Sequence, residues 1–78
     1  MKSDKDKRLI RLLKIVVILG QGSFNAKRFA QEENCSWRTI QRDIVALECA
    51  GFPLHKQYNG YWVLDEDFRL SGFKKFRR

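Results

Sequence analysis

The stretch Ser36-Trp37-Arg38-Thr39-Ile40-Gln41-Arg42-Asp43-Ile44-Val45-Ala46-Leu47-Glu48-Cys49-Ala50-Gly51, residues 36–51, decides the fold. Ser36 is a favoured residue for capping a helix N-terminus, and Gly51 is a favoured residue for ending a helix. Between these two residues, an apolar stripe recurs at the spacing of one helical face: Ile40, Ile44 and Leu47. The pattern predicts a helix over residues 37–50 that buries this stripe.

A second, shorter helix is expected just before this stretch, over residues 26–33. Asn25 can cap it, and its apolar stripe is narrow: Ala26, Phe29 and Ala30. Only about three residues, 34–36, then connect the two helices, which matches the tight connection of a helix-turn-helix.

The N-terminal part of the chain predicts a further helix over residues 5–19, with Ser3 or Asp4 as its cap and with Gly20 and Gly22 ending it. The β-branched run 15–18 alone favours a strand, but the helical spacing before it and the glycines after it outweigh that preference. The residues expected to share one buried face are Leu9, Leu12, Leu13, Val16 and Leu19.

A β-hairpin is expected at the other end, because residues 54–57 and 61–64 flank Tyr58-Asn59-Gly60, and Asn-Gly is a strong hairpin signal. Alternation along the second strand turns Trp62 and Leu64 toward the helices and Tyr61 and Val63 away from them. The sequence therefore predicts a mainly α member of the α+β class, a winged helix-turn-helix over residues 1–66. Residues 67–78 would form a basic tail or the start of a linker to a further domain.

Length and composition restrict the function classes. A chain of 78 residues with 44% hydrophobic and 32% charged residues has the size and composition of one globular domain. Its apolar runs are too short to cross a membrane, so a cytoplasmic location is expected. Cys35, Cys49 and His55 have no convergent partners in the sequence, so we expect no metal, no cofactor and no enzymatic activity.

The net charge of +7 suggests a polyanionic partner, although this signal is partly local. Residues 73–78 contain four of the sixteen basic side chains, so residues 1–72 carry a net charge of only +3. The basic tail could follow a phosphate backbone, contact a second subunit, or be the ragged end of a longer chain.

On the helix predicted at residues 37–50, Arg38, Gln41 and Arg42 share the face opposite the apolar stripe. Arginine and glutamine can read guanine and adenine edges through paired hydrogen bonds, which makes this face a candidate reader of double-stranded DNA. The alternative is an ordinary solvated surface. Asp43 lies beside the apolar stripe, where we expect a structural ion pair with Arg8 or Arg11.

The remaining candidate DNA contacts have competing structural explanations. Trp37 could pack at the margin of the core or reach a sugar-phosphate strand or a thymine methyl group. Ser36 is first a helix cap, and Thr39 is the better phosphate ligand of the two. Asn59 is sufficiently explained by the turn. The other candidates, which could contact phosphates or be plain surface residues, are Lys27, Arg28, Lys56 and Tyr58.

The pattern Ser36-x-Arg38-Thr39-Ile40-x-Arg42-Asp43-Ile44-x-x-Leu47-x-x-x-Gly51-x-Pro53-Leu54, followed by Gly60-Tyr61-Trp62-Val63-Leu64, resembles the N-terminal domain of bacterial WYL-domain transcriptional regulators, which are DeoR-like. This resemblance implies transcriptional regulation, with the helix at 37–50 in the major groove of operator DNA and the wing at 54–64 on the backbone or minor groove. Residues 67–70 are similar to the segment that leads to the ligand-sensing domain of such regulators.

Two other functions stay open at this point: a winged-helix module that binds protein, and a nucleic-acid binder without sequence preference. A homodimer is also expected, because one recognition helix reads only a few base pairs and paired half-sites supply most of the specificity. No dimer surface stands out in the sequence.

Overall fold

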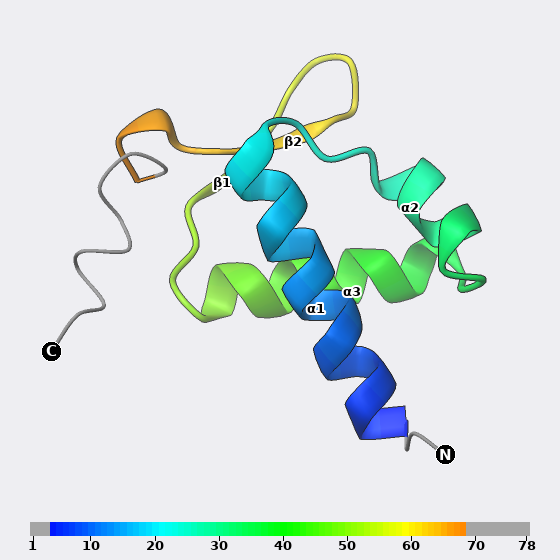
Figure 1. Cartoon of the computed structure of the whole chain (residues 1–78). Helices are drawn as coiled ribbons and strands as arrows, with labels where there is room; N and C mark the ends of the chain where they lie inside the picture. The colour runs from blue at the N-terminus through cyan, green and yellow to red at the C-terminus, as the bar shows by residue number, and fades with distance from the viewer. Residues whose placement is uncertain (1–3, 69–78) are drawn as a thin grey trace, which may run out of the picture.

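The computed structural model describes residues 4–68 and contains three helices followed by a two-stranded hairpin (Figure 1). The helices are α1 (Asp4–Gln21), α2 (Ala26–Glu32) and α3 (Trp37–Cys49), and the strands are β1 (Leu54–Lys56) and β2 (Trp62–Leu64). In Figure 1, α1 passes in front of α3 at a steep angle, α2 lies near the start of α3, and the hairpin rises beyond the C-terminal end of α1. This order confirms the predicted winged helix.

Local capping sets the helix ends. The side chain of Asn25 accepts a hydrogen bond from the backbone N–H of Arg28, at 3.2 Å, and the hydroxyl of Ser36 accepts one from the N–H of Thr39, also at 3.2 Å. Gly51 follows α3 with a φ of 107°, a left-handed conformation that favours glycine. The caps predicted at Asn25 and Ser36 and the stop predicted at Gly51 are therefore confirmed, and each helix end lies within two residues of its prediction. The stop predicted at Gly20 is wrong, because α1 continues through Gly20 to Gln21 and ends just before Gly22.

The buried face of α1 is not the one expected from the sequence. Ile15 and Leu19 are almost completely buried, whereas Leu9 and Leu13 are 56% and 57% exposed. The stripe predicted from Leu9 to Leu19 is therefore wrong at these two positions. Because α1 carries apolar residues on most of its circumference, spacing alone could not show which side packs against the rest of the protein.

The core lies where α1, α2, α3 and the hairpin meet. Phe24 is 1% exposed, and its ring packs edge-to-face on Phe29 with the centroids 5.1 Å apart. The expected stripe of α3 is buried with them, since Ile40 and Ile44 are at most 1% exposed and Leu47 is 5% exposed. Burial of this set is the main stabilising contribution to the fold.

The hairpin is antiparallel, with Leu54 opposite Leu64 and Lys56 opposite Trp62. It gains a third partner, because Phe24 and Trp62 exchange backbone hydrogen bonds of 2.8 Å and 2.9 Å. This bridge, which the sequence did not predict, fixes the wing to the segment between α1 and α2. The second strand of the wing is therefore hydrogen-bonded on both edges, to β1 and to Phe24.

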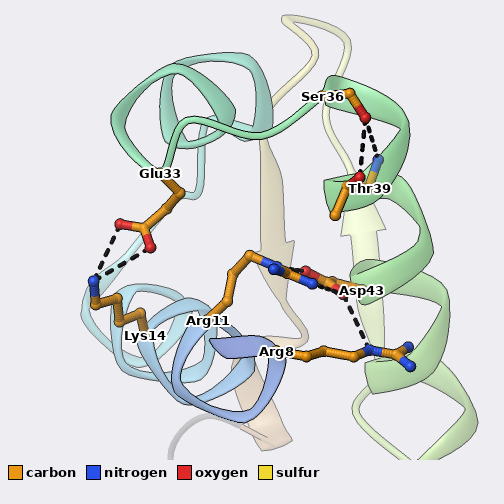
Figure 2. Close-up of polar contacts among 7 residues, drawn as sticks. All are labelled: Arg8, Arg11, Lys14, Glu33, Ser36, Thr39 and Asp43. Carbon is orange, nitrogen blue, oxygen red and sulfur yellow. Dashed lines mark hydrogen bonds and ion pairs between the residues drawn. The ribbon is translucent and has the colours of Figure 1, made fainter. Parts of the chain in front are cut away.

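A buried charge connects α1 to α3. Asp43 is 1% exposed and forms an ion pair with the guanidinium of Arg11, and it lies 3.5 Å from Nε of Arg8 (Figure 2). The hydrogen bond that Arg11 donates to the Asp43 carboxylate raises the pKa of Arg11 above its already high usual value. The expected structural role of Asp43 is confirmed.

None of the helices within residues 4–68 has the length and apolarity needed to span a bilayer. Of the two cap candidates for α1, Asp4 is already a helical residue and so is not the cap, whereas Ser3 lies outside the described residues, as does the basic tail at 73–78.

Candidate nucleic-acid interface

The outer face of α3 carries two exposed arginines, Arg38 and Arg42. They lie one turn apart and on the side away from Ile40 and Ile44, which are buried. Gln41 is half-buried and turns instead toward the wing, where it lines a surface hollow. The predicted face is therefore present, with Gln41 at its edge.

That hollow, which we call the wing hollow, has a volume of about 690 Å³ and lies between the start of α2, the start of α3 and the hairpin. It brings together six of the candidate residues, although they come from three separate segments: Lys27, Arg28, Trp37, Gln41, Lys56 and Asn59. Its lining contains three cationic side chains and no acidic one, so it is chemically suited to an anionic strand.

Trp37 opens α3 and is 48% exposed, with its ring on the wall of the wing hollow. About half of the side chain is covered by protein, as packing at the margin of the core requires, and the other half is exposed. An aromatic surface beside cations is suited to sugar and thymine methyl contacts.

Ser36 and Thr39 are tied to each other and to the helix end (Figure 2). Their hydroxyl oxygens lie 2.9 Å apart, and Ser36 also accepts from the backbone of Thr39. Ser36 therefore acts as the cap of α3, while Thr39 is half-buried at the first turn. Neither of them lines the wing hollow.

On the wing, Lys56 places its Nζ atom 6.0 Å from the centre of the Trp62 ring, at cation–π distance. The side chain of Asn59 accepts a hydrogen bond from the N–H of Tyr61 at 3.0 Å, which confirms its turn-forming role. Tyr58 is fully exposed at the tip and does not line the hollow.

Six residues complete the lining without having been candidates: Asn25, Ala26, Gln31, Gly60, Tyr61 and Trp62. Trp62 was expected only to face the core. It is half-buried, packs against the core, and also lies at cation–π distance from Lys56. The sequence signal that could have indicated Tyr61 and Trp62 as lining residues is their position as an aromatic pair directly after the Asn59-Gly60 turn.

Among the described residues, some of the charged side chains near the interface form ion pairs and others do not. Arg28 forms an exposed ion pair with Glu32 at 3.3 Å, which reduces its effect on a ligand only weakly. Within residues 4–68, none of the ion pairs involves Lys27, Arg38, Arg42 or Lys56, and all four side chains are exposed. Asp43, the acidic residue of α3 closest to this face, is neutralised from behind by Arg11.

The two cysteines are free thiols. Cys35 is half-buried in the turn between α2 and α3, and burial raises the pKa of its thiol despite the opposing charge of Arg11. Cys49 is exposed at the end of α3. In the described part of the protein, no three metal-ligating side chains gather.

Three helices, a tight turn before the third, and a hairpin packed beside them define a winged helix-turn-helix protein. The sequence pattern of the HTH domain family matches residues 11–61, more than half of the chain, and the protein belongs to this family of DNA-binding domains. No curated protein and no solved structure matches the chain.

Proposed function

We propose that this protein is a sequence-specific transcriptional regulator, or the DNA-binding domain of one. The observation that supports this proposal most strongly is the wing hollow, a cationic and aromatic surface whose two α3 residues, Trp37 and Gln41, directly precede the exposed Arg38 and Arg42 in the sequence. A reading surface and a phosphate-binding surface are the two parts that sequence-specific binding needs.

In this proposal α3 enters the major groove, where Arg38, Gln41 and Arg42 contact base edges. Phosphates of the flanking strand contact Lys27 and Arg28 at the start of α2, and Thr39 at the start of α3. The wing lies on the backbone or in the minor groove through Lys56, Tyr58 and Asn59. Ser36 contributes by fixing the start of α3, and Trp37 by apolar contact with a sugar or a thymine methyl group.

The resemblance to DeoR-like WYL-domain regulators supports a regulatory role in the bacterial cytoplasm. We take residues 1–66 as the DNA-binding unit and residues 67–78 as a basic tail or the start of a linker to a ligand-sensing domain. Self-association belongs to the same proposal, because a single recognition helix reads a short site.

Fluorescence anisotropy titrations against a promoter library at several salt concentrations test the proposal. We expect some sequences to bind at least ~1,000-fold more tightly than random DNA. The double variant R38A/R42A should lose this preference, while Lys27→Ala should weaken binding to every sequence by a similar factor. The control Lys5→Ala, on the N-terminal turns of α1, should bind like the wild type.

The same titrations separate the competing functions. Equal affinity for all sequences with a steep salt dependence would indicate a non-specific nucleic-acid binder. No binding to any duplex, together with a stoichiometric protein partner that survives nuclease treatment, would indicate a protein-binding module.

A further inference from the structure

The outer face of α1 carries three large apolar side chains that are more than half exposed. Leu9, Leu13 and Val17, which we call the α1 stripe, are 56%, 57% and 58% exposed. Their spacing of four residues places them in one row along the helix. The stripe continues into an apolar hollow of about 500 Å³ between α1 and α2, lined by Leu13, Val17 and Phe29 among others.

We propose that the α1 stripe binds a second copy of this chain through antiparallel pairing of the two α1 helices. A twofold axis through Leu13 would place Leu13 against the partner's Leu13 and Leu9 against the partner's Val17. The stripe is symmetric about its centre, with one apolar residue four positions before Leu13 and one four positions after it. Such self-complementarity is what a twofold interface requires.

Two of the charged residues on the α2 side of the α1 stripe, Lys7 and Glu32, fit the same arrangement. Lys7 and Glu33 line one hollow on the α2 side of α1, and Glu32 lines the apolar hollow on that same side, next to Leu13 and Val17. In an antiparallel twofold pair, the α2 side of each α1 lies on the same side of the dimer, but the two helices run in opposite directions along it. The partner's Lys7 therefore comes to the end of the stripe where Glu32 lies, so that opposite charges meet.

The position of the stripe also determines what the dimer can do. The inner side of α1 packs on α3 through Ile15 and Arg11, whereas Arg38 and Arg42 lie on the far side of α3. Pairing through the outer side of α1 would therefore leave the two recognition faces pointing away from each other. A dimer of this kind holds two separate DNA segments, in contrast to the adjacent half-sites expected from the sequence.

Sedimentation equilibrium tests the interface without any DNA, so its result does not depend on whether the protein reads DNA sequence. Leu13→Glu puts two carboxylates at the twofold axis and should weaken self-association at least ~30-fold. Val45→Glu is the matched control, because Val45 is equally apolar and 54% exposed on α3. It should leave self-association unchanged. A wild-type protein that stays monomeric at about 1 mM would overturn the proposal, and so would equal association of Leu13→Glu and the wild type.

Cysteine cross-linking tests the register in a Cys35→Ser and Cys49→Ser background. Leu13→Cys should form a disulfide-linked dimer on mild oxidation, because only a residue on the axis meets its own copy. Val17→Cys alone should not cross-link, whereas Leu9→Cys combined with Val17→Cys should. Faster cross-linking of Val17→Cys than of Leu13→Cys would overturn the antiparallel register.

Charge reversal tests the flank. Glu32→Lys should weaken self-association, and adding Lys7→Glu should restore it, because the swapped pair again has opposite charges. A double variant that self-associates as weakly as Glu32→Lys would contradict the contact.

A pull-down with two differently labelled duplexes tests whether the dimer bridges DNA. Bridging should be lost in Leu13→Glu, although that variant still binds one duplex. Bridging that persists in Leu13→Glu would overturn the proposed dimer.

Discussion

Asp43 is a carboxylate on the helix that carries the exposed arginines, and the structure turns it inward to Arg11 and Arg8. An acidic group on the outer face would repel phosphate. Here the same group holds α1 against α3 instead, with its side chain 1% exposed and that of Arg11 16% exposed.

Asp43→Asn should therefore destabilise the fold by about 3 kcal/mol, because it leaves the half-buried guanidinium of Arg11 without its counter-ion. Urea unfolding followed by circular dichroism measures the loss. Glu32→Gln is the matched control, since it removes an exposed ion pair with Arg28 and should cost less than about 1 kcal/mol. Equal stability of Asp43→Asn and the wild type would show that the buried pair is not important to the fold.

Trp37 gives a second residue-scale prediction. If its exposed half contacts a thymine methyl group, replacing that thymine by uracil in a selected site should weaken binding by about 1 kcal/mol, the value of one buried methyl group. Substitution at each thymine in turn, measured by anisotropy, locates the contact. Trp37→Ala should then bind both DNAs equally, and a wild type indifferent to every substitution would exclude this role.

At the scale of single elements, the start of α3 depends on Ser36. Ser36→Ala removes the acceptor for the N–H of Thr39 and should lower the free energy of unfolding by about 1 kcal/mol. Ser36→Asp, which supplies another capping oxygen, should retain most of the stability. Both are measured by urea unfolding, and an alanine variant more stable than the aspartate variant would argue against the cap.

The elements that could be predicted from the sequence were those with local signals. Ser36, Asn25 and Gly51 mark helix ends through interactions with their own neighbours, and Asn59 and Gly60 form a turn in the same way. The bridge between Phe24 and Trp62 could not be predicted, because it pairs backbone groups that are distant in sequence and show no periodic pattern.

The candidate site shows the same division. The outward placement of Arg38 and Arg42 follows from the apolar stripe of their own helix. The wing hollow required the relative positions of α2, α3 and the hairpin, so Trp62, Asn25 and Gln31 were missed. On α1 the sequence showed that the helix is rich in apolar residues, but it did not show which side of the helix packs against the rest of the protein. Leu9 and Leu13 were therefore wrongly assigned to the core.

At the scale of the whole molecule, much of the net positive charge lies in a different part of the sequence from the proposed reading surface on α3. Residues 73–78 hold four of the sixteen basic side chains, whereas the arginines of the proposed reading surface, Arg38 and Arg42, are exposed on α3. Deleting residues 73–78 should weaken binding to all DNA sequences by a similar factor and lower the salt slope by at most ~4, leaving the preference among sequences unchanged. Salt titrations on a selected and a random duplex measure both quantities. A change in the preferred sequence would show that the tail reads bases.

The central claim, that the outer face of α3 reads DNA sequence, is tested most directly by in vitro selection from random duplexes. Wild-type protein should enrich one motif, and R38A/R42A should fail to enrich it although it remains folded. Enrichment of the same motif by both proteins, or of no motif by the wild type, would contradict the claim.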